Sequence, residues 1–391
     1  MIDLGLARIN ALLSSLGNPQ NYFKAFHIAG TNGKGSVVSY LSSILVNYGV
    51  KTGRFTSPHL ITENDGICIN NTPISIEQYY QVTKHVAQVD RDHSIGSTEF
   101  ELQTAVAFES FRENNVKVAV VEVGLGGLMD ATNVLDAQNV LCAGITKISV
   151  DHEHFLGSTL SAIAKHKVGI VKKGMTCVVD GTNDPEVKRE IEDHCRANDA
   201  QLYFVEGIPE PVNNLIRKND ILAGDFQVQN AAVAVKIALL HNIPPETIAD
   251  GLRATVWRGR LDWTEFKGKR VLVDGAHNVG SAKELKKYCQ SVFREPVTWI
   301  VAFSKPCDEI LPILVERGDT VICTSFGPVD NMPWIKPQKT DKVAAVALKL
   351  TDRVETIESV GEINVSEYPN IVVCGSLYLL KEILAANSNM N

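Results

Sequence analysis

The hydrophobic positions of the chain fall into two recurring patterns. Short runs, several of them almost continuously apolar, are typical of strands buried on both faces of a parallel sheet. They occur at residues 23–29, 51–56, 116–123, 140–148, 175–180, 201–205, 270–274, 297–303, 319–324 and 370–374. Stretches with apolar residues at helical spacing separate them, at 2–16, 37–46, from 76 onward, 98–114, 158–171, 184–198, 227–241, 245–254, 280–292, 307–316 and 341–350. Strands that alternate with helices predict an α/β fold with parallel sheets.

One of these helices carries a clear start signal in the sequence. Thr98 stands at the N-cap position of the helix predicted at 98–114, and Glu101 follows three residues later. In a capping box, these two side chains each bind the backbone N–H of the other residue. We therefore expect this helix to begin at Thr98.

A glycine-rich segment follows the first predicted strand. It reads Gly30-Thr31-Asn32-Gly33-Lys34-Gly35-Ser36 and leads directly into the helix predicted at 37–46. The backbone N–H groups of such a loop and the start of the next helix together bind phosphate groups. Lys34 can reach the outer phosphates of a nucleotide, and the hydroxyl of Ser36 can bind Mg²⁺.

The segment departs from the strict phosphate-loop pattern, in which Lys directly precedes Ser or Thr. Here Gly35 separates Lys34 from Ser36. The structural alternative is a tight turn without a ligand, but a strand before it, a helix after it and a lysine among the glycines favour phosphate binding. A site for ATP or GTP is therefore predicted at residues 31–36.

Length and a break in the pattern indicate two domains. The chain has 391 residues, more than a single hydrophobic core usually organises. The alternation stops at 257–263 and then restarts, so a linker is predicted near 256–264. We expect a nucleotide-binding parallel-sheet domain over 1–262 and a smaller Rossmann-like α/β domain over 265–391.

Composition and charge exclude several classes of protein. The net charge of −7 argues against general nucleic-acid binding, because no basic excess exists to neutralise a phosphate backbone. The eight cysteines are scattered without a C-x-x-C pair, which favours small core residues in a reducing compartment. No apolar run is long enough to cross a membrane, and neither a secretory nor a mitochondrial leader is evident. We expect a cytoplasmic protein that binds no membrane.

Polar residues stand at the ends of three predicted strands. Ser57 follows the strand at 51–56, Glu122 closes the strand at 116–123, and His152 follows the strand at 140–148. In open α/β sheets, ligands bind beyond the carboxyl ends of the strands. Each residue alone also fits a turn or a cap, but beside a phosphate loop the three make a plausible Mg²⁺ shell. The chain has neither a GTPase N-K-x-D motif nor a kinase catalytic loop.

Five further residues are candidates for the site, and two of them have a second, structural interpretation. Lys167, on the helix at 158–171, is either part of a solvated face or a lysine of lowered pKa that has reacted with CO₂. Asn230 is either a solvent-facing helix residue or a ligand contact. Asp274 and His277 end one strand and open the next helix, a position typical of ligand contacts. Arg260, in the linker, is placed to bind phosphates.

Taken in order, these motifs resemble one family over nearly the whole chain. They are Gly30-Thr-Asn-Gly-Lys-Gly-Ser36, Thr56-Ser-Pro-His-Leu60, Glu122-Val-Gly-Leu-Gly-Gly127 with Asp130-Ala-Thr-Asn133, Asp151-His152 with Leu156-Gly157, and Asp274-Gly-Ala-His-Asn278. The chain resembles the folylpolyglutamate synthase and dihydrofolate synthase family of the Mur-ligase superfamily. It is most similar to the fungal dihydrofolate synthases, through residues 98–102, 144–148 and 332–335.

The resemblance implies a two-domain Mur-ligase fold and a ligase reaction. ATP phosphorylates the carboxylate of dihydropteroate, and the amino group of L-glutamate attacks the acyl phosphate. Two Mg²⁺ ions are implied, the first near Ser36, Ser57 and Glu122 and the second at His152. Lys167 is implied as N6-carboxylysine, a monovalent cation is a further ligand that the resemblance allows, and the family suggests a monomer.

The family pattern also assigns residues to each substrate. Lys34 binds the outer phosphates, and the catalytic set comprises Lys34, Glu122, His152 and Lys167. The residues implied in nucleotide binding are Thr31, Asn32, Gly33, Lys34, Gly35, Ser36, Asn230, Arg260, Asp274 and His277. Those implied in binding the pterin are Asp3, Leu4, Gly5, Phe100 and Asp130.

Two departures from the family pattern keep alternatives open. Leu128 replaces the usual arginine after Gly-Gly, and His166 replaces the glutamate that usually precedes the carbamylated lysine. The main alternative is a folylpolyglutamate synthase, or a bifunctional enzyme. Another is a paralogue that binds nucleotide and folate without efficient catalysis. A murein-type ligase is disfavoured because the chain lacks the extra N-terminal domain.

Overall fold

The computed structural model describes residues 3–294, 296–329 and 335–388. The chain divides into two compact units, one formed by Met1–Ile221 with Phe226–Val256 and the other by Leu222–Asp225 with Trp257–Asn391. The main boundary, after Val256, lies in the stretch predicted as a linker. Of the fungal-type motif at 332–335, residues 332–334 lie outside the described residues.

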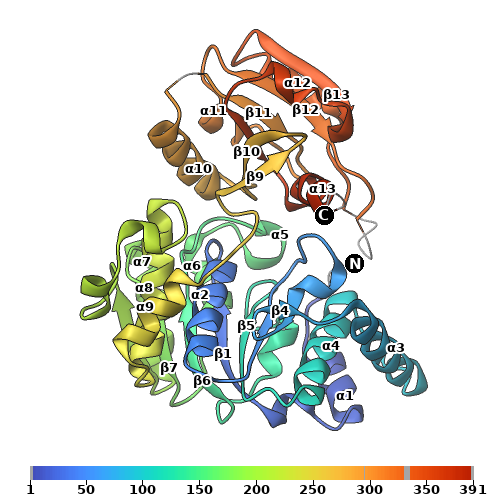
Figure 1. The fold of residues 1–391 in the computed structure, drawn as a ribbon. Coiled ribbons are helices and arrows are strands. Elements are labelled where there is room, and N and C mark those ends of the chain that lie inside the picture. The colour runs from blue at the N-terminus through green and yellow to red at the C-terminus, as the bar shows by residue number, and fades with distance from the viewer. Residues whose placement is uncertain (1–2, 295, 330–334, 389–391) are drawn as a thin grey trace. The chain divides into compact units, whose positions relative to one another are not determined.

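The first unit is built on an eight-stranded sheet with the order β4-β3-β2-β5-β1-β6-β7-β8 (Figure 1). Its strands are β1 (Lys24–Ala29), β2 (Thr52–Phe55), β3 (Ile67–Ile69), β4 (Thr72–Pro73), β5 (Val118–Glu122), β6 (Val140–Ile145), β7 (Thr176–Asp180) and β8 (Gln201–Val205). Strands β2, β5, β1, β6, β7 and β8 are parallel, and the β3–β4 hairpin is antiparallel. The continuous apolar runs therefore became the buried parallel strands, as predicted.

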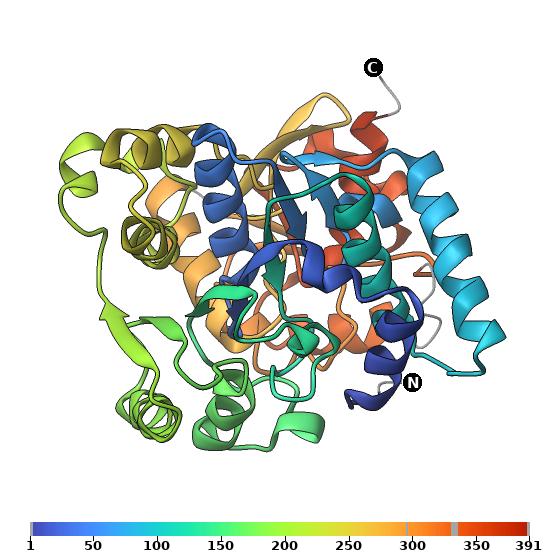
Figure 2. The same ribbon diagram turned by 90° about the horizontal axis from the view of Figure 1, so that it is seen from below.

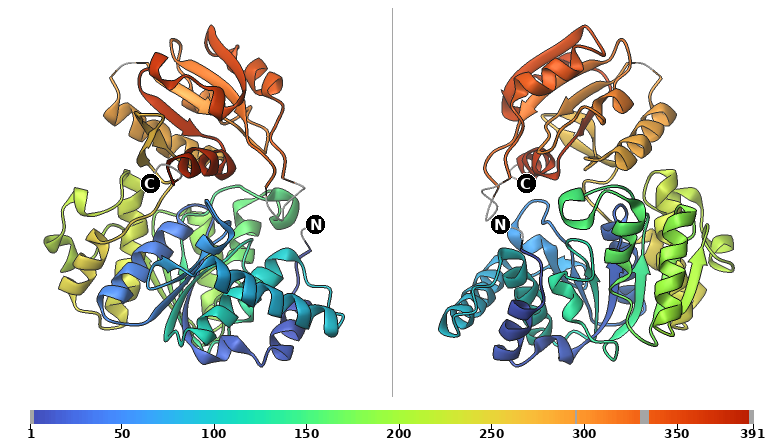
Figure 3. Two further views of the ribbon diagram at one scale, coloured as in Figure 1. Left: turned by 45° about the vertical axis from the view of Figure 1, so that its right-hand side comes forward. Right: turned by 180° about the vertical axis from the view of Figure 1, so that it is seen from behind.

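Helices cover both faces of this sheet (Figure 3). Those of the unit are α1 (Ala7–Ser15), α2 (Lys34–Asn47), α3 (Ile76–Asp92), α4 (Glu99–Glu113), α5 (Glu153–Leu156), α6 (Leu160–Val168), α7 (Pro185–Ala197), α8 (Asp225–Leu240) and α9 (Pro245–Arg253). Residues of α1, α3, α4, α6 and α7 share one hydrophobic core with the strands. In Figure 2, α3 and α4 lie side by side near α1.

Successive side chains of β1 point to opposite faces of the sheet, and both faces are packed. Ala25 and Ala29 belong to the core under α4 and α6, and the ring of Phe26 packs edge-on against His241 after α8. Every residue of β1 after Lys24 is buried. Side chains on both faces thus bury β1, and the glycine-rich segment begins directly at its carboxyl end.

The predicted capping box of α4 is confirmed. Thr98 accepts a hydrogen bond from Glu101 N, and Glu101 Oε2 accepts one from Thr98 N at 2.6 Å. The same carboxylate oxygen accepts from Arg8 Nε of α1 at 3.0 Å. Glu101 thereby joins the start of α4 to α1.

The second unit contains a six-stranded sheet with the order β13-β12-β11-β14-β10-β9. The strands are β9 (Asp262–Phe266), β10 (Lys269–Val273), β11 (Thr298–Val301), β12 (Thr320–Ser325), β13 (Arg353–Ser359) and β14 (Ile371–Cys374), and only the β9–β10 pair is antiparallel. Its helices are α10 (Val279–Val292), α11 (Leu311–Leu314), α12 (Thr340–Ala347) and α13 (Leu377–Ser388). The prediction of an α/β fold with parallel sheets is confirmed, since the strands of both sheets are mostly parallel.

Some boundaries were predicted wrongly. The helix predicted at 2–16 begins only at Ala7, because the residues before it form a turn held by Arg8. The helix predicted at 307–316 is a single turn at Leu311–Leu314, since Pro312 lacks an N–H and is tolerated only in a first turn. Strands β3, β4, β9 and β13 and helices α5 and α13 were not predicted. Among the described residues, no helix is long and apolar enough to span a membrane.

Candidate active site

The glycine-rich segment connects β1 to α2, and two of its glycines have no room for a side chain. Gly30 has φ +148°, and a Cβ added there would lie 1.8 Å from Thr146 Oγ1. Gly33, the N-cap of α2, has φ +92°, and its Cβ would lie 2.1 Å from Asn230 Oδ1. Glycine is needed at both positions for conformation and for space.

The segment is anchored to the chain that follows β6. Thr31 Oγ1 donates to Ser149 O at 3.0 Å and accepts from Ser149 N at 3.1 Å. The backbone N–H groups of Thr31 and Asn32 both donate to Lys147 O. The side chain of Thr31 therefore fixes the loop.

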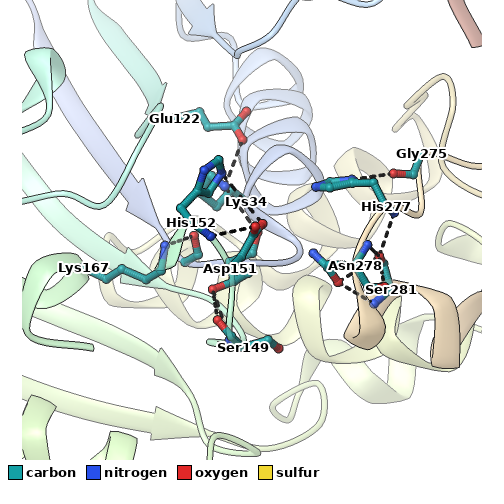
Figure 4. A network of polar contacts seen from close by, with 12 residues as sticks. Lys34, Glu122, Ser149, Asp151, His152, Lys167, Gly275, His277, Asn278 and Ser281 are labelled. Carbon is teal, nitrogen blue, oxygen red and sulfur yellow. Dashed lines mark hydrogen bonds and ion pairs between the residues drawn. The ribbon is translucent and has the colours of Figure 1, made fainter. Parts of the chain in front are cut away.

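Lys34 and Glu122 face each other across the carboxyl ends of β1 and β5 (Figure 4). Lys34 Nζ lies 3.8 Å from Glu122 Oε1 and donates to Thr31 O at 3.3 Å. Their side chains are 16% and 8% exposed, so the two charges interact in a largely dehydrated environment. A cation and a carboxylate thus stand beside the predicted phosphate position.

Lys167 reaches the same loop from α6. Its side chain is buried, and Nζ donates to Gly30 O at 2.7 Å. Burial, and then the positive charge of Lys34, lower the pKa of this amine from 10.5 to about 7. A substantial neutral fraction exists near neutral pH, and the neutral amine is the form that reacts with CO₂.

His152 follows Asp151 with left-handed backbone, at φ +55°. Its backbone N–H donates to Asp151 Oδ1 at 2.8 Å, and its Nε2 lies 3.8 Å from Asp151 Oδ2. The imidazole is 37% exposed and points to the same region as Lys34 and Glu122 in Figure 4. Ser57 lies two residues after the end of β2 and is half-buried.

The side-chain oxygens beside the glycine-rich segment are too few to surround a metal ion by themselves, but they suit Mg²⁺. Among the described residues, no group of three or more His, Cys, Asp and Glu side chains is placed to hold a metal ion. Mg²⁺ usually takes one or two protein carboxylates or hydroxyls and completes its shell with water and substrate phosphates. The buried hydroxyl of Ser36 and the carboxylate of Glu122 are donors of that kind.

Sequence reasoning missed a contact from α8 to Ser36. Gln227 Nε2 donates to Ser36 Oγ at 3.2 Å, and Asn230 Nδ2 donates to Gln227 Oε1 at 3.0 Å. Asn230 is therefore buried against the loop and is not a solvent-facing residue. The only signal was a second carboxamide three residues before Asn230, on the same face of the helix.

Phe100, one of the residues predicted to bind the pterin, lies beside the loop that follows Glu122 at the end of β5. Its ring stacks with that of Phe55, with centroids 6.2 Å apart. A Cβ on Gly124 would lie 2.3 Å from Phe100 Cζ, so the loop after β5 passes directly over the ring.

Asp130 is buried, and its carboxylate shapes this loop. It accepts hydrogen bonds from Leu125 N at 2.7 Å, Thr132 N at 3.0 Å and Thr132 Oγ1 at 2.6 Å. Thr132 Oγ1 also lies 2.8 Å from His27 Nε2 in β1. Because Thr132 donates to Asp130, the imidazole donates to Thr132. Burial, and then the charge of Lys172, lower the pKa of His27 to about 3, which keeps it neutral.

The N-terminal turn is tied to α4 through two ion pairs of Arg8 that the sequence did not reveal. Asp3 Oδ2 lies 2.8 Å from Arg8 Nη1, and Arg8 Nε donates to the buried Glu101 at 3.0 Å. Leu4 and Gly5 are half-buried in this turn. The turn and Phe100 are thus held on neighbouring elements.

In the second unit, Arg260, Asp274 and His277 meet at the start of α10. Asp274 accepts from Leu261 N at 2.8 Å and from Ala276 N at 2.9 Å, and burial raises its pKa. A Cβ on Gly275 would lie 2.2 Å from Arg260 Nη1. His277 Nδ1 lies 2.8 Å from Gly275 O. The three predicted residues of this unit therefore cluster at the carboxyl end of β10.

Comparison with known proteins places this arrangement in a family. Residues 28–200 match the Mur ligase middle domain, and residues 260–386 match the C-terminal domain of dihydrofolate synthetase. The chain is 38% identical over 423 residues to a dihydrofolate synthetase of Saccharomyces cerevisiae, with 99% of each chain covered. It is 40% identical over 410 residues to a probable dihydrofolate synthetase of Schizosaccharomyces pombe, with 98% of each covered. The chain belongs to the folylpolyglutamate synthase and dihydrofolate synthase family.

Solved structures agree with this assignment. A folylpolyglutamate synthase of Thermotoga maritima has 31% identity and a TM-score of 0.84, covering 100% of this chain and 94% of that chain. A bifunctional folylpolyglutamate synthase/dihydrofolate synthase with Mn, AMPPNP and L-glutamate bound has 25% identity and a TM-score of 0.83, covering 99% and 95%. The family resemblance expected from the motifs, including that to the fungal enzymes, is confirmed.

The two departures from the family pattern lie in direct contact. Leu128 N donates to His166 O at 2.7 Å. A Cβ on Gly127 would lie 2.7 Å from His166 O and 2.9 Å from Lys167 O, so the loop packs tightly on the end of α6. The side chain of Leu128 is 44% exposed. In this family member the two replaced residues thus form one local contact next to Lys167.

Proposed function

We propose that this chain is a dihydrofolate synthase. It joins L-glutamate to 7,8-dihydropteroate with ATP and gives 7,8-dihydrofolate, ADP and phosphate. The observation that carries the chemistry is the glycine loop with the partly buried Lys34–Glu122 pair beside it. The full-length similarity to two fungal dihydrofolate synthetases supports this choice of acceptor over a folate polyglutamate.

Catalysis in this reaction depends on positioning and on neutralising charge, because an unactivated carboxylate is a poor electrophile. The loop N–H groups and Lys34 hold the outer phosphates of ATP. Ser36, Ser57 and Glu122 hold a first Mg²⁺, and His152 holds a second. These ions neutralise charge on the phosphates when they are bound. The carboxylate of the acceptor becomes an acyl phosphate, and phosphate leaves when the glutamate nitrogen attacks.

Lys167 is proposed as N6-carboxylysine. The amine is buried beside Gly30 O and has a pKa of about 7, which favours reaction with CO₂. The resulting carbamate is an anion that helps to hold the second Mg²⁺.

For the pterin we propose the surface made by Phe100 and the N-terminal turn Asp3-Leu4-Gly5. Asp130 contributes through the loop that it shapes, since three hydrogen bonds within the loop occupy its carboxylate. Asn230 contributes to the nucleotide site next to Gly33. Arg260, Asp274 and His277 stay predicted nucleotide residues, and the monovalent cation, the monomeric state and the cytoplasmic location stay predictions.

The test measures ADP release with Mg-ATP and L-glutamate, with dihydropteroate or tetrahydrofolate as acceptor, and follows the product by mass. Gain of one glutamate on dihydropteroate alone supports the proposal. Gain on tetrahydrofolate instead identifies a polyglutamate synthase. Nucleotide binding without gain on either acceptor favours a non-catalytic paralogue.

A further inference from the structure

Helix α8 reaches the phosphate loop through two buried carboxamides. Gln227 and Asn230 are three residues apart and therefore share one face of the helix. Gln227 is 0% exposed, Asn230 5% and Ser36 3%. A polar side chain that is completely buried usually has a specific partner. The partner of Gln227 is Ser36, which the proposed function assigns to Mg²⁺ binding.

The contacts fix the orientation of Gln227. Its Nε2 donates to Ser36 Oγ at 3.2 Å, and its Oε1 accepts from Asn230 Nδ2 at 3.0 Å. Because the nitrogen of a carboxamide only donates and its oxygen only accepts, the bond from Asn230 determines which end of Gln227 faces the serine. Asn230 in turn touches the loop at Gly33. The two carboxamides therefore hold both ends of the segment between Gly33 and Ser36.

The direction of the hydrogen bond matters for a metal. A serine hydroxyl has one proton and two lone pairs. Gln227 occupies one lone pair of Ser36, which leaves the other free to bind a cation. A hydroxyl without such a donor can instead turn to a backbone carbonyl of the preceding turn, as serines in helices often do. Gln227 thus selects one orientation of the Ser36 side chain.

We propose that Gln227 is a positioning residue for the magnesium nucleotide, which acts by holding the Ser36 hydroxyl toward the metal. This inference rests on the proposed function, in which Ser36 binds the Mg²⁺ of Mg-ATP. Gln227 acts mainly through Ser36, so its loss weakens the metal-dependent part of nucleotide binding far more than the metal-free part.

The experiment measures the affinity for AMPPNP by titration calorimetry, once with Mg²⁺ and once with EDTA. Gln227→Met keeps the length of the side chain and removes both the donor to Ser36 and the acceptor of the Asn230 amide. Loss of one such hydrogen bond is expected to weaken binding about tenfold with Mg²⁺ and less than about twofold with EDTA. Equal losses under both conditions, or no loss, would overturn the inference. If Gln227→Met does not fold, as judged by thermal unfolding, Gln227→Leu takes its place.

Gln229 provides a matched control on the same helix. Its carboxamide bonds the backbone of the β8 region, with Gly207 N donating to Oε1 at 2.9 Å and Nε2 donating to Val205 O. Gln229→Met therefore removes an equivalent side chain from α8 without touching the loop. It is expected to lower thermal stability and to leave both affinities unchanged. If Gln229→Met shows the same Mg²⁺-dependent loss of affinity, destabilising α8 is sufficient to cause that loss and the specific role of Gln227 is wrong.

Ser36→Ala separates this inference from the proposed function. If Ser36→Ala weakens Mg²⁺-dependent binding and Gln227→Met does not, only the positioning role is wrong. If Ser36→Ala has no effect, the assignment of Ser36 to the metal is wrong as well. In the double variant the two losses are expected not to add, because both act through one hydroxyl. Additive losses would contradict a common pathway.

Discussion

Replacing Gly33 by alanine tests the geometry of the phosphate loop directly. The new methyl group would lie 2.1 Å from Asn230 Oδ1, in a residue whose φ is +92°. A left-handed backbone costs an L-residue about 1–2 kcal/mol, and overpacking against the buried Asn230 side chain costs about 1–3 kcal/mol more. Asn230 cannot move away freely, because its amide donates to Gln227. We expect Gly33→Ala to lower the free energy of unfolding by about 2–5 kcal/mol.

Gly49→Ala is a matched control for Gly33→Ala, because the two glycines have similar backbone conformations. It follows the other end of α2, has φ +83°, and nothing lies within 4 Å of a Cβ added there. Gly49→Ala therefore carries the conformational cost alone, about 1–2 kcal/mol. Asn230→Ala in the Gly33→Ala background removes the atom that the methyl group meets and should restore part of the loss.

The assay is urea unfolding followed by fluorescence and circular dichroism, with AMPPNP affinity measured in parallel. The two units can unfold separately, so only the transition that involves the first unit is compared. If Gly33→Ala is no less stable than Gly49→Ala, the steric argument is wrong. If it is less stable but keeps full nucleotide affinity, the loop does not bind phosphate.

Three further results are expected. Lys34→Ala and Glu122→Ala abolish amide formation and leave the circular dichroism spectrum unchanged; turnover in either variant contradicts the site assignment. Lys167→Ala is inactive and is partly rescued by a small carboxylic acid, while indifference to such acids argues against the carbamate. His27→Gln makes the protein less sensitive to acid in pH-dependent urea unfolding: the folded pKa is about 3 against 6.5 unfolded, so the unfolded state binds the extra proton and stability falls as the pH drops from 6.5 toward 3. An unchanged pH profile would contradict a neutral, buried His27.

The elements that sequence predicted well are those decided by local pattern. Buried parallel strands such as β5 are apolar at almost every position, and the capping box of α4 depends on two side chains three residues apart. The missed strands have weaker patterns. In β13, at the edge of its sheet, five of the seven residues are exposed, so its sequence lacks an apolar run. Its pairing is decided by β12, which no local window contains.

The candidate site shows the same division. The phosphate loop was visible because its residues are consecutive, and Glu122 and His152 were visible because each ends a strand. The contacts of Gln227, Arg8 and Thr132 were not, since each joins segments about a hundred or more residues apart. Nothing in the local sequence distinguishes such a side chain from an ordinary polar residue.

The structure of the phosphate loop explains why its residues could be predicted from the sequence and its contacts could not. Its glycines remove side chains, so the loop cannot determine its own shape and takes it from its neighbours. Thr146 and Asn230 fill the spaces beside Gly30 and Gly33, and Lys167 donates to Gly30 O. Each comes from a different element, and none is close to the loop in sequence. Substitutions just after β6, on α6 or on α8 are therefore expected to change nucleotide binding even where they touch no ligand, with the largest effect from those facing a glycine.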